Sequence, residues 1–87
     1  TLAAGSMLVS PNPANSTATL SLQQADAANV RVELLDLTGR TIAVVAQGRT
    51  AAGLHRWELP VRALNSGVYL VRVVQDGRQQ VLRFTKE

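Results

Sequence analysis

Apolar and polar residues alternate with a period of two over several short segments of the chain. Val30, Val32 and Leu34 alternate with Arg31 and Glu33, so the apolar side chains share one face of an extended strand. Between residues 67 and 75 both faces are largely apolar, which is typical of a strand in the middle of a sheet. The alternation predicts seven strands, at about residues 6–9, 17–23, 29–36, 40–47, 53–59, 67–75 and 78–86.

Turn-forming residues separate these segments. The Asp-Gly pair at 76–77 is the strongest hairpin signal, and the loop at 36–39 places a glycine where a turn needs a positive φ. The Ser-Pro-Asn-Pro sequence at 10–13 predicts a rigid, extended turn segment, because each proline fixes its own φ and restrains its predecessor. Residues 21–29 include helix-compatible residues, but the segment is too short for a stable helix and we expect a loop.

Short strands joined by turns predict an all-β protein, either an antiparallel sandwich or a small barrel. Two sheets would each bury one face against the other. The last strand allows two registers, because Val81 and Leu82 are adjacent and both apolar. We expect the core to contain Leu20, Leu22, Val30, Val32, Leu34, Ile42, Val44, Trp57, Leu59, Leu64, Val68, Leu70 and either Leu82 or Phe84.

The composition limits the size and the chemistry of the protein. A chain of 87 residues with 46% hydrophobic residues forms one small domain with a thin core. It has no cysteine and a single histidine, so disulfides, cysteine nucleophiles and Cys/His zinc sites are excluded within it. The chain starts at Thr1 without a signal peptide, which indicates a piece of something longer. We expect residues 1–7 to be a linker or a cloning remnant and residues 8–87 to be the domain.

The charge pattern does not indicate a nucleic-acid interface or a membrane span. Nine basic residues give a net charge of +3, but they are spread singly along the chain and only three residues are aromatic. A nucleic-acid-binding surface usually concentrates positive charge in a stripe with aromatic residues between. No segment approaches the ~20 consecutive apolar residues that a transmembrane helix requires.

Few residues suggest catalysis or ligand binding. His55 is the only candidate for a general base at neutral pH, but no nucleophile motif accompanies it. Asp36 and Asp76 occupy turn positions, where aspartate hydrogen-bonds the backbone. We therefore predict no catalytic residue and no metal site. Trp57 and Tyr69 leave two readings open, since they either belong to the core or form a sugar-binding platform.

The ordered set of motifs resembles a known family. The segments are residues 10–14 (SPNPA), 32–40 (VELLDLTGR), 53–55 (GLH), 64–73 (LNSGVYLVRV) and 81–86 (VLRFTK). Together they resemble the type A C-terminal sorting domain of the type IX secretion system of Bacteroidetes, over about residues 8 to 87. The resemblance implies an immunoglobulin-like sandwich of about seven strands at the C-terminus of exported enzymes and adhesins, without catalytic activity and without a cofactor.

The resemblance also implies a route and a set of partners. The cargo crosses the inner membrane on an N-terminal signal peptide, passes through the periplasm and is recognised by the outer-membrane translocon. In type A members a surface sortase usually removes the domain and links the cargo to lipopolysaccharide, and here the cut would fall in or before residues 1–8. The signal elements would be Pro11, Asn12, Pro13, Gly39, Gly67, Val68 and Tyr69, with Arg83 and Lys86 on the terminal strand.

The sequence leaves two points about the terminal strand undecided, and it allows two alternative functions. The strand could offer an edge to a receptor, or to a second copy in a strand-paired dimer. The chain ends Lys86-Glu87, whereas family members often end close to a basic residue, which leaves the role of Lys86 open. The alternatives are a carbohydrate-binding accessory module, which requires an exposed Trp57 or Tyr69, and a structural immunoglobulin-like spacer.

Overall fold

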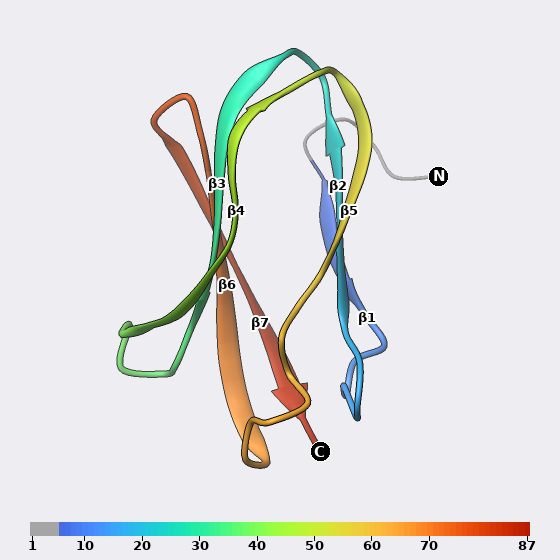
Figure 1. Ribbon diagram of the computed structural model, residues 1–87, viewed down its shortest axis with the longest axis vertical. Helices are drawn as coiled ribbons and strands as arrows, with labels where there is room; N and C mark the ends of the chain where they lie inside the picture. The colour runs from blue at the N-terminus through green and yellow to red at the C-terminus, as the bar shows by residue number, and fades with distance from the viewer. Residues whose placement is uncertain (1–5) are drawn as a thin grey trace.

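The computed structural model describes residues 6–87, which form seven β-strands in two facing sheets (Figure 1). All seven predicted strands are confirmed, with end points that differ by up to three residues. Residues 25–27, between the second and third strands, form a loop, as expected. The strands are β1 (Met7–Ser10), β2 (Thr19–Gln24), β3 (Ala28–Leu35), β4 (Thr41–Thr50), β5 (Gly53–Glu58), β6 (Gly67–Gln75) and β7 (Arg78–Lys86).

One sheet has the order β1-β2-β5 and the other the order β4-β3-β6-β7, and all neighbouring strands are antiparallel. The chain passes between the sheets from β2 to β3, from β4 to β5 and from β5 to β6 (Figure 1). This architecture is the immunoglobulin-like antiparallel β-sandwich that the sequence predicted. Residues 6–87 contain no helix that is long and apolar enough to cross a membrane.

The core lies between the two sheets. Leu20 and Leu22 of β2 face Val32, Val73 and Phe84 of the larger sheet, and all five side chains are buried. Burying a side chain of this size contributes roughly 1.5–3 kcal/mol relative to leaving it exposed. Outside β6, the sequence prediction also missed five core residues: Val9, Ala14, Ala18, Ala28 and Val61.

The predicted core positions on β4 are wrong. Ile42 and Val44 are 41% and 47% exposed, whereas the side chains of Ala43 and Val45 pack against the core. The pairing of β3 with β4 shifts register between Val32 and Glu33 and again between Leu34 and Leu35. Such an irregularity moves the following side chains to the other face of the strand, and nothing in the alternation of β4 announces it.

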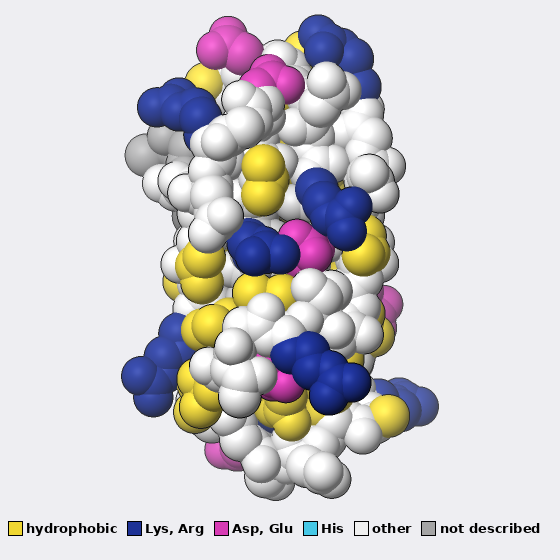
Figure 2. Space-filling model, turned by 90° about the vertical axis from the view of Figure 1, so that its left-hand side faces the viewer, with side chains coloured by type: hydrophobic (Ala, Val, Ile, Leu, Met, Phe, Trp, Pro, Cys, Tyr) yellow, Lys and Arg dark blue, Asp and Glu magenta, His cyan; other side chains and the backbone are white. Residues whose placement is uncertain are grey.

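The face of β6 was also assigned incorrectly. Val71 and Val73 are fully buried between the sheets, while Val68 and Leu70 lie on the outer face and remain partly exposed. Both faces of β6 are apolar, so alternation alone could not select the inner one. Figure 2 shows hydrophobic side chains on the outside of the four-stranded sheet, interspersed with charged ones.

The remaining core predictions hold in most cases. On β7, Phe84 is buried and Leu82 packs against the core, so Val81 points outward. Trp57 and Leu64 are half-buried and pack against the core. Of the expected linker 1–7, residues 1–5 lie outside the described part of the chain, and Met7 is the first residue of β1.

Candidate recognition site at the end of the terminal strand

The end of β7 is held by the Pro-Asn-Pro segment. The Ala14 N–H donates to the Thr85 carbonyl at 2.7 Å, and the Ala14 carbonyl accepts from the Glu87 N–H at 2.8 Å. The Asn12 Oδ1 atom accepts from the Thr85 N–H at 3.1 Å. Ala14 and Lys86 thus form a short parallel bridge. We call these contacts between residues 12–14 and 85–87 the terminal clasp.

The Gly-Val-Tyr segment lies on the other edge of the same residues. Gly67 pairs with Lys86, and Tyr69 pairs with Phe84. The Tyr69 ring lies 6.0 Å from the Phe84 ring, and its hydroxyl donates to the Asn65 carbonyl at 2.7 Å. Three motifs that are separate in the sequence therefore meet at one end of the sandwich.

The two basic residues of the terminal strand lie on opposite faces of it. Lys86 shares the inner face with Phe84, is only 8% exposed, and donates from Nζ to the Glu87 carbonyl at 2.8 Å. Arg83 is exposed and pairs with Leu70, on the outer face of the sheet. Lys86 therefore helps to hold the chain end, whereas Arg83 is available to a partner.

The other predicted signal residues differ in their surroundings. Pro11 and Pro13 are exposed and each follows a cis peptide bond. Gly39 lies in the β3–β4 turn, apart from the terminal clasp (Figure 1). Its φ of +87° is the left-handed conformation that glycine adopts readily, so the turn itself accounts for this residue. Gly67 is the first residue of β6 and not part of a turn.

An ion pair that sequence reasoning did not anticipate lies within the four-stranded sheet. Glu33 is only 4% exposed, and its Oε1 atom accepts from Arg72 at 2.8 and 3.0 Å. Thr41 donates to its other carboxylate oxygen at 3.1 Å, and Arg31 lies 3.4 Å away. A charged residue on each of two adjacent, otherwise apolar strands was the signal for this pair.

These contacts shift the protonation of Glu33. Burial by itself opposes ionisation of the carboxyl. The hydrogen bonds from Arg72 and Thr41, together with the charges of Arg72 and Arg31, outweigh burial, so the pKa of Glu33 lies below its ordinary value of 4.5. Glu33 is thus a carboxylate at neutral pH, committed to joining β3, β4 and β6 and not available for proton transfer.

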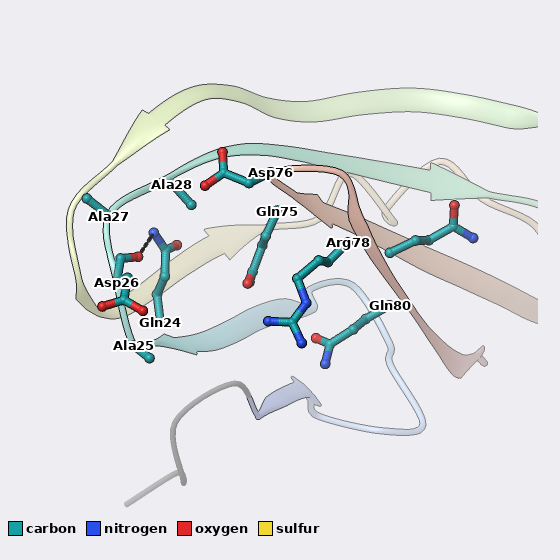
Figure 3. A pocket seen from close by; sticks show the side chains of 10 residues that line it. Gln24, Ala25, Asp26, Ala27, Ala28, Gln75, Asp76, Arg78 and Gln80 are labelled. Atoms are coloured by element: carbon teal, nitrogen blue, oxygen red, sulfur yellow. Dashed lines mark hydrogen bonds between the residues drawn. The ribbon is translucent and has the colours of Figure 1, made fainter.

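A polar cleft of about 500 Å³ lies between the β2–β3 loop and the β6–β7 hairpin (Figure 3). Gln24, Gln75 and Arg78 point into it. Gln24 is held by Thr50 and by the Asp26 carbonyl, while the buried Gln75 Nε2 atom has no protein partner. The residues that line the cleft include no histidine and no serine, threonine or cysteine nucleophile. Among residues 6–87, no group of three or more His, Asp or Glu residues could hold a metal ion.

His55 and the two large polar aromatics have structural partners. The His55 ring stacks on Trp57 at 5.7 Å, and its Nε2 atom lies 2.6 Å from the Ala51 carbonyl. Trp57 and Tyr69 are half-buried and pack against the core. Neither ring forms the flat exposed platform that sugar stacking requires, which counts against the carbohydrate-binding alternative.

Fold and motif cluster together define a small β-sandwich domain whose C-terminal end is built from its most distinctive sequence segments. The sequence model of the secretion system C-terminal sorting domain matches residues 8–87. The chain therefore belongs to this family of type IX secretion sorting domains. No match was found among curated proteins.

Solved structures show a likeness of fold. The chain is similar to part of PorZ, a bacterial surface component of the type IX secretion system of Porphyromonas gingivalis, with a TM-score of 0.68 and 24% identity. The match covers 93% of this chain but 11% of PorZ, so this chain spans about a tenth of that protein. A second match, to the DNA glycosylase AlkC of Pseudomonas fluorescens bound to DNA, covers 99% of this chain and 31% of that one, with 16% identity and a TM-score of 0.41. That score is too low to support an argument.

Proposed function

We propose that this domain is the removable export signal of a larger cargo protein and that the type IX outer-membrane translocon reads it at the terminal clasp. Membership of the sorting-domain family supports the role in secretion. One observation supports the place of recognition: the Pro-Asn-Pro, Gly-Val-Tyr and terminal segments lie far apart in the sequence but contact one another at one end of the fold. The domain itself carries no chemistry in this proposal.

The terminal clasp suits recognition because it fixes the chain end before the receptor arrives. Five hydrogen bonds, four of them to Asn12, Ala14 and Asn65, hold residues 85–87 and the Tyr69 ring in one arrangement. A receptor that binds an ordered end avoids the entropy cost of ordering it, which for each immobilised side chain is about 0.5–1.5 kcal/mol. At this end of the domain, Pro11, Asn12 and Pro13 are exposed and available for contact with a receptor.

The outer edge of β7 gives the receptor a second way to bind. β7 is the last strand of its sheet, and within residues 6–87 the terminal clasp lies on that edge at residues 85–87. A strand of the receptor could add to the edge along the preceding residues, where it would find Arg83 beside it. Because the terminal clasp already occupies the end, an added strand would stop before Thr85. The same limit applies to a strand-paired dimer in isolation.

The proposal places the cargo before β1 and the cut near the start of the domain. After transit through the periplasm and the outer membrane, a surface sortase cleaves in or before residues 1–8 and releases the sandwich. The cargo stays at the surface or is secreted. Cleavage there would separate the parts without cutting any strand after β1.

An export assay tests the proposal. We would fuse residues 1–87 behind a fluorescent protein that carries a signal peptide, in a bacterium with an intact type IX system. The expected result is reporter at the cell surface, shortened by about the 9.3 kDa mass of the domain. Deletion of residues 85–87 and the substitution Asn12→Ala should each retain the reporter in the periplasm.

The matched control is Asn15→Ala, which changes a second exposed asparagine of the same loop without touching the terminal clasp. It should export normally. Circular dichroism of each purified variant separates loss of the signal from loss of the fold. Normal export of a folded variant that lacks residues 85–87 would show that the terminal clasp is not the signal.

A further inference from the structure

The four-stranded sheet has an apolar outer face that no other part of residues 6–87 covers. Antiparallel sheets usually place polar side chains on the face that meets water. Here the strand register aligns Val44, Glu33, Arg72 and Val81 across the sheet in one row, and Leu35, Leu70 and Arg83 in the next. We call the outward residues of these four strands the outer sheet face: Asn29, Arg31, Glu33, Leu35, Thr41, Ile42, Val44, Gln47, Arg49, Val68, Leu70, Arg72, Val74, Gln79, Val81, Arg83 and Thr85.

The apolar side chains of this face lie on its two edge strands and on β6 between them, with the Glu33–Arg72 pair in the middle of one row. Val44 and Val81 are 47% and 48% exposed at the two edges, while Val68, Leu70 and Val74 are partly exposed between them. Figure 2 shows hydrophobic side chains scattered over this side of the molecule between charged ones. Four strands about 4.8 Å apart and roughly nine residues long span on the order of 600 Å². That area is near the lower end of what one partner contributes to a specific interface, about 600–1,000 Å².

The outer sheet face also carries the net charge of the whole chain. It holds four arginines (Arg31, Arg49, Arg72 and Arg83) and one acidic residue, Glu33. The other five basic and five acidic residues of the sequence lie elsewhere and cancel, so the face accounts for all of the +3. Glu33 is already bound by Arg72 and Arg31, which leaves Arg49 and Arg83 without a carboxylate partner among the described residues.

From the exposed apolar side chains of the outer sheet face and the positive charge around them, we infer that this face is a docking surface for an acidic protein. Aliphatic side chains of the partner would cover Val44, Leu70 and Val81, and its carboxylates would pair with Arg49 and Arg83. Such complementarity favours a specific partner and speeds association. A second copy of the chain is disfavoured because two faces of equal charge would repel each other.

A membrane surface fits this face less well. Proteins that bind the lipid interface usually present Trp and Tyr to it. All three aromatic residues of this chain, Trp57, Tyr69 and Phe84, lie on the inner side of the sandwich. The inference goes beyond the export signal, because it concerns outward side chains spread over all four strands and neither the hydrogen bonds of the terminal clasp nor strand addition at β7. Arg83 borders both surfaces.

The test is an NMR titration of the 15N-labelled chain at low salt with a synthetic peptide that repeats Glu-Ser-Leu-Ser. In an extended peptide the glutamates and leucines share one face, which matches the alternating apolar and basic groups of the outer sheet face. We expect shifts of the amide signals of Arg49, Leu70 and Val81 and of their neighbours. A peptide with lysine in place of glutamate should cause none.

Two pairs of variants make the result specific. Arg49→Glu with Arg83→Glu should weaken peptide binding about tenfold or more, whereas Arg56→Glu with Arg62→Glu, which changes the net charge equally but lies outside the face, should change it less than twofold. Val81→Ser should weaken binding, and Leu54→Ser, an equally exposed apolar residue on β5, should not. Dispersed amide spectra confirm that each variant is folded.

Three outcomes would overturn the inference. In the first, the two double variants weaken binding equally, which would mean that only net charge matters. In the second, the lysine peptide binds as well as the glutamate peptide. In the third, the chain binds phosphatidylglycerol vesicles but not the acidic peptide, which would assign the face to a membrane. None of these outcomes bears on export, so the two proposals fail or stand separately.

Discussion

The two halves of β7 differ in how firmly the fold holds them. Near its end, Thr85 is hydrogen-bonded on one edge to Asn12 and Ala14 and paired on the other with Val68. Near its start, Arg78 pairs only with Gln75, beside the polar cleft. Three of the five segments that carry the family resemblance meet at the firmly held end. The last residues of β7 are thus held in the sheet on both sides.

This contrast teaches where the specificity of an export signal can reside. The first half of β7 lies at the edge of its sheet, a feature that many sheets share and that carries little sequence information. The last residues offer a defined surface that requires Asn12, Ala14 and Tyr69 in addition to the terminal strand itself. Three substitutions test this difference between the two halves. One changes the core, one changes the ion pair within the sheet, and one removes a single hydrogen bond of the terminal clasp.

The largest effect is expected from Phe84→Ala. Phe84 is fully buried, packs against Tyr69 and lies one residue before the terminal clasp. Removing a buried aromatic ring should lower the free energy of unfolding by about 3–5 kcal/mol. Chemical denaturation measures this change in the free energy of unfolding. Val81→Ala, three residues earlier on the same strand and half exposed, is the control and should stay within about 0.5 kcal/mol of the native protein. Similar losses for both would mean that the strand is equally anchored along its length.

A smaller effect, felt by both halves of β7, should follow from Glu33→Gln. Glu33 joins β3 to β6 through Arg72, and β6 pairs with all of β7. Loss of the charged hydrogen bonds should cost about 1.5–3 kcal/mol of unfolding free energy. Amide hydrogen exchange should accelerate at both ends of β7. Acceleration at one end only would show that the ion pair supports that half alone.

The same substitution gives a pH test. The pKa of Glu33 is lowered in the folded protein, so its contribution to stability is present above pH 4.5 and disappears as the pH falls through the lower folded value. Stability of the native chain should therefore decrease below about pH 4.5, and less so in Glu33→Gln. Some decrease should remain, because hydrogen bonds from Thr38 and Arg40 also lower the pKa of Asp36. An unchanged pH profile in the variant would contradict this account.

Much of the fold could be predicted from the sequence because alternation and turn residues are local signals. The β6–β7 hairpin follows from Asp76-Gly77, where Asp76 has a φ of +46° and Gly77 one of +84°. The inner face of β2 and β3 follows from alternation with polar neighbours. The inward residues of β4 did not follow, since the register shifts opposite Glu33 and Leu35 are set by pairing between strands and leave no local trace.

The candidate site was predicted in its parts but not in its arrangement. The resemblance selected Asn12, Tyr69 and Lys86 one by one, yet periodicity could not show that residues 12–14 bridge to residues 85–87, which lie more than seventy positions away. The opposite roles of Lys86 and Arg83 depend on strand parity, which was ambiguous because Val81 and Leu82 are both apolar. The buried state of Lys86 could not be anticipated, since lysine is almost never buried without a partner.

The smallest effect on stability, and the most local, should come from Asn12→Ala. The substitution removes a single exposed hydrogen bond, from the Thr85 N–H to Asn12, and should cost about 0.5–1.5 kcal/mol. Hydrogen exchange of the Thr85 amide should become faster, while the exchange of amides in the first half of β7 should not change. Asn15→Ala, which lacks this contact, should alter neither. If Asn12→Ala released the whole strand, the terminal clasp would be an essential part of the fold. If only Thr85 responds, a loss of export in the same variant can be attributed to recognition, because the sandwich that carries the terminal clasp is intact.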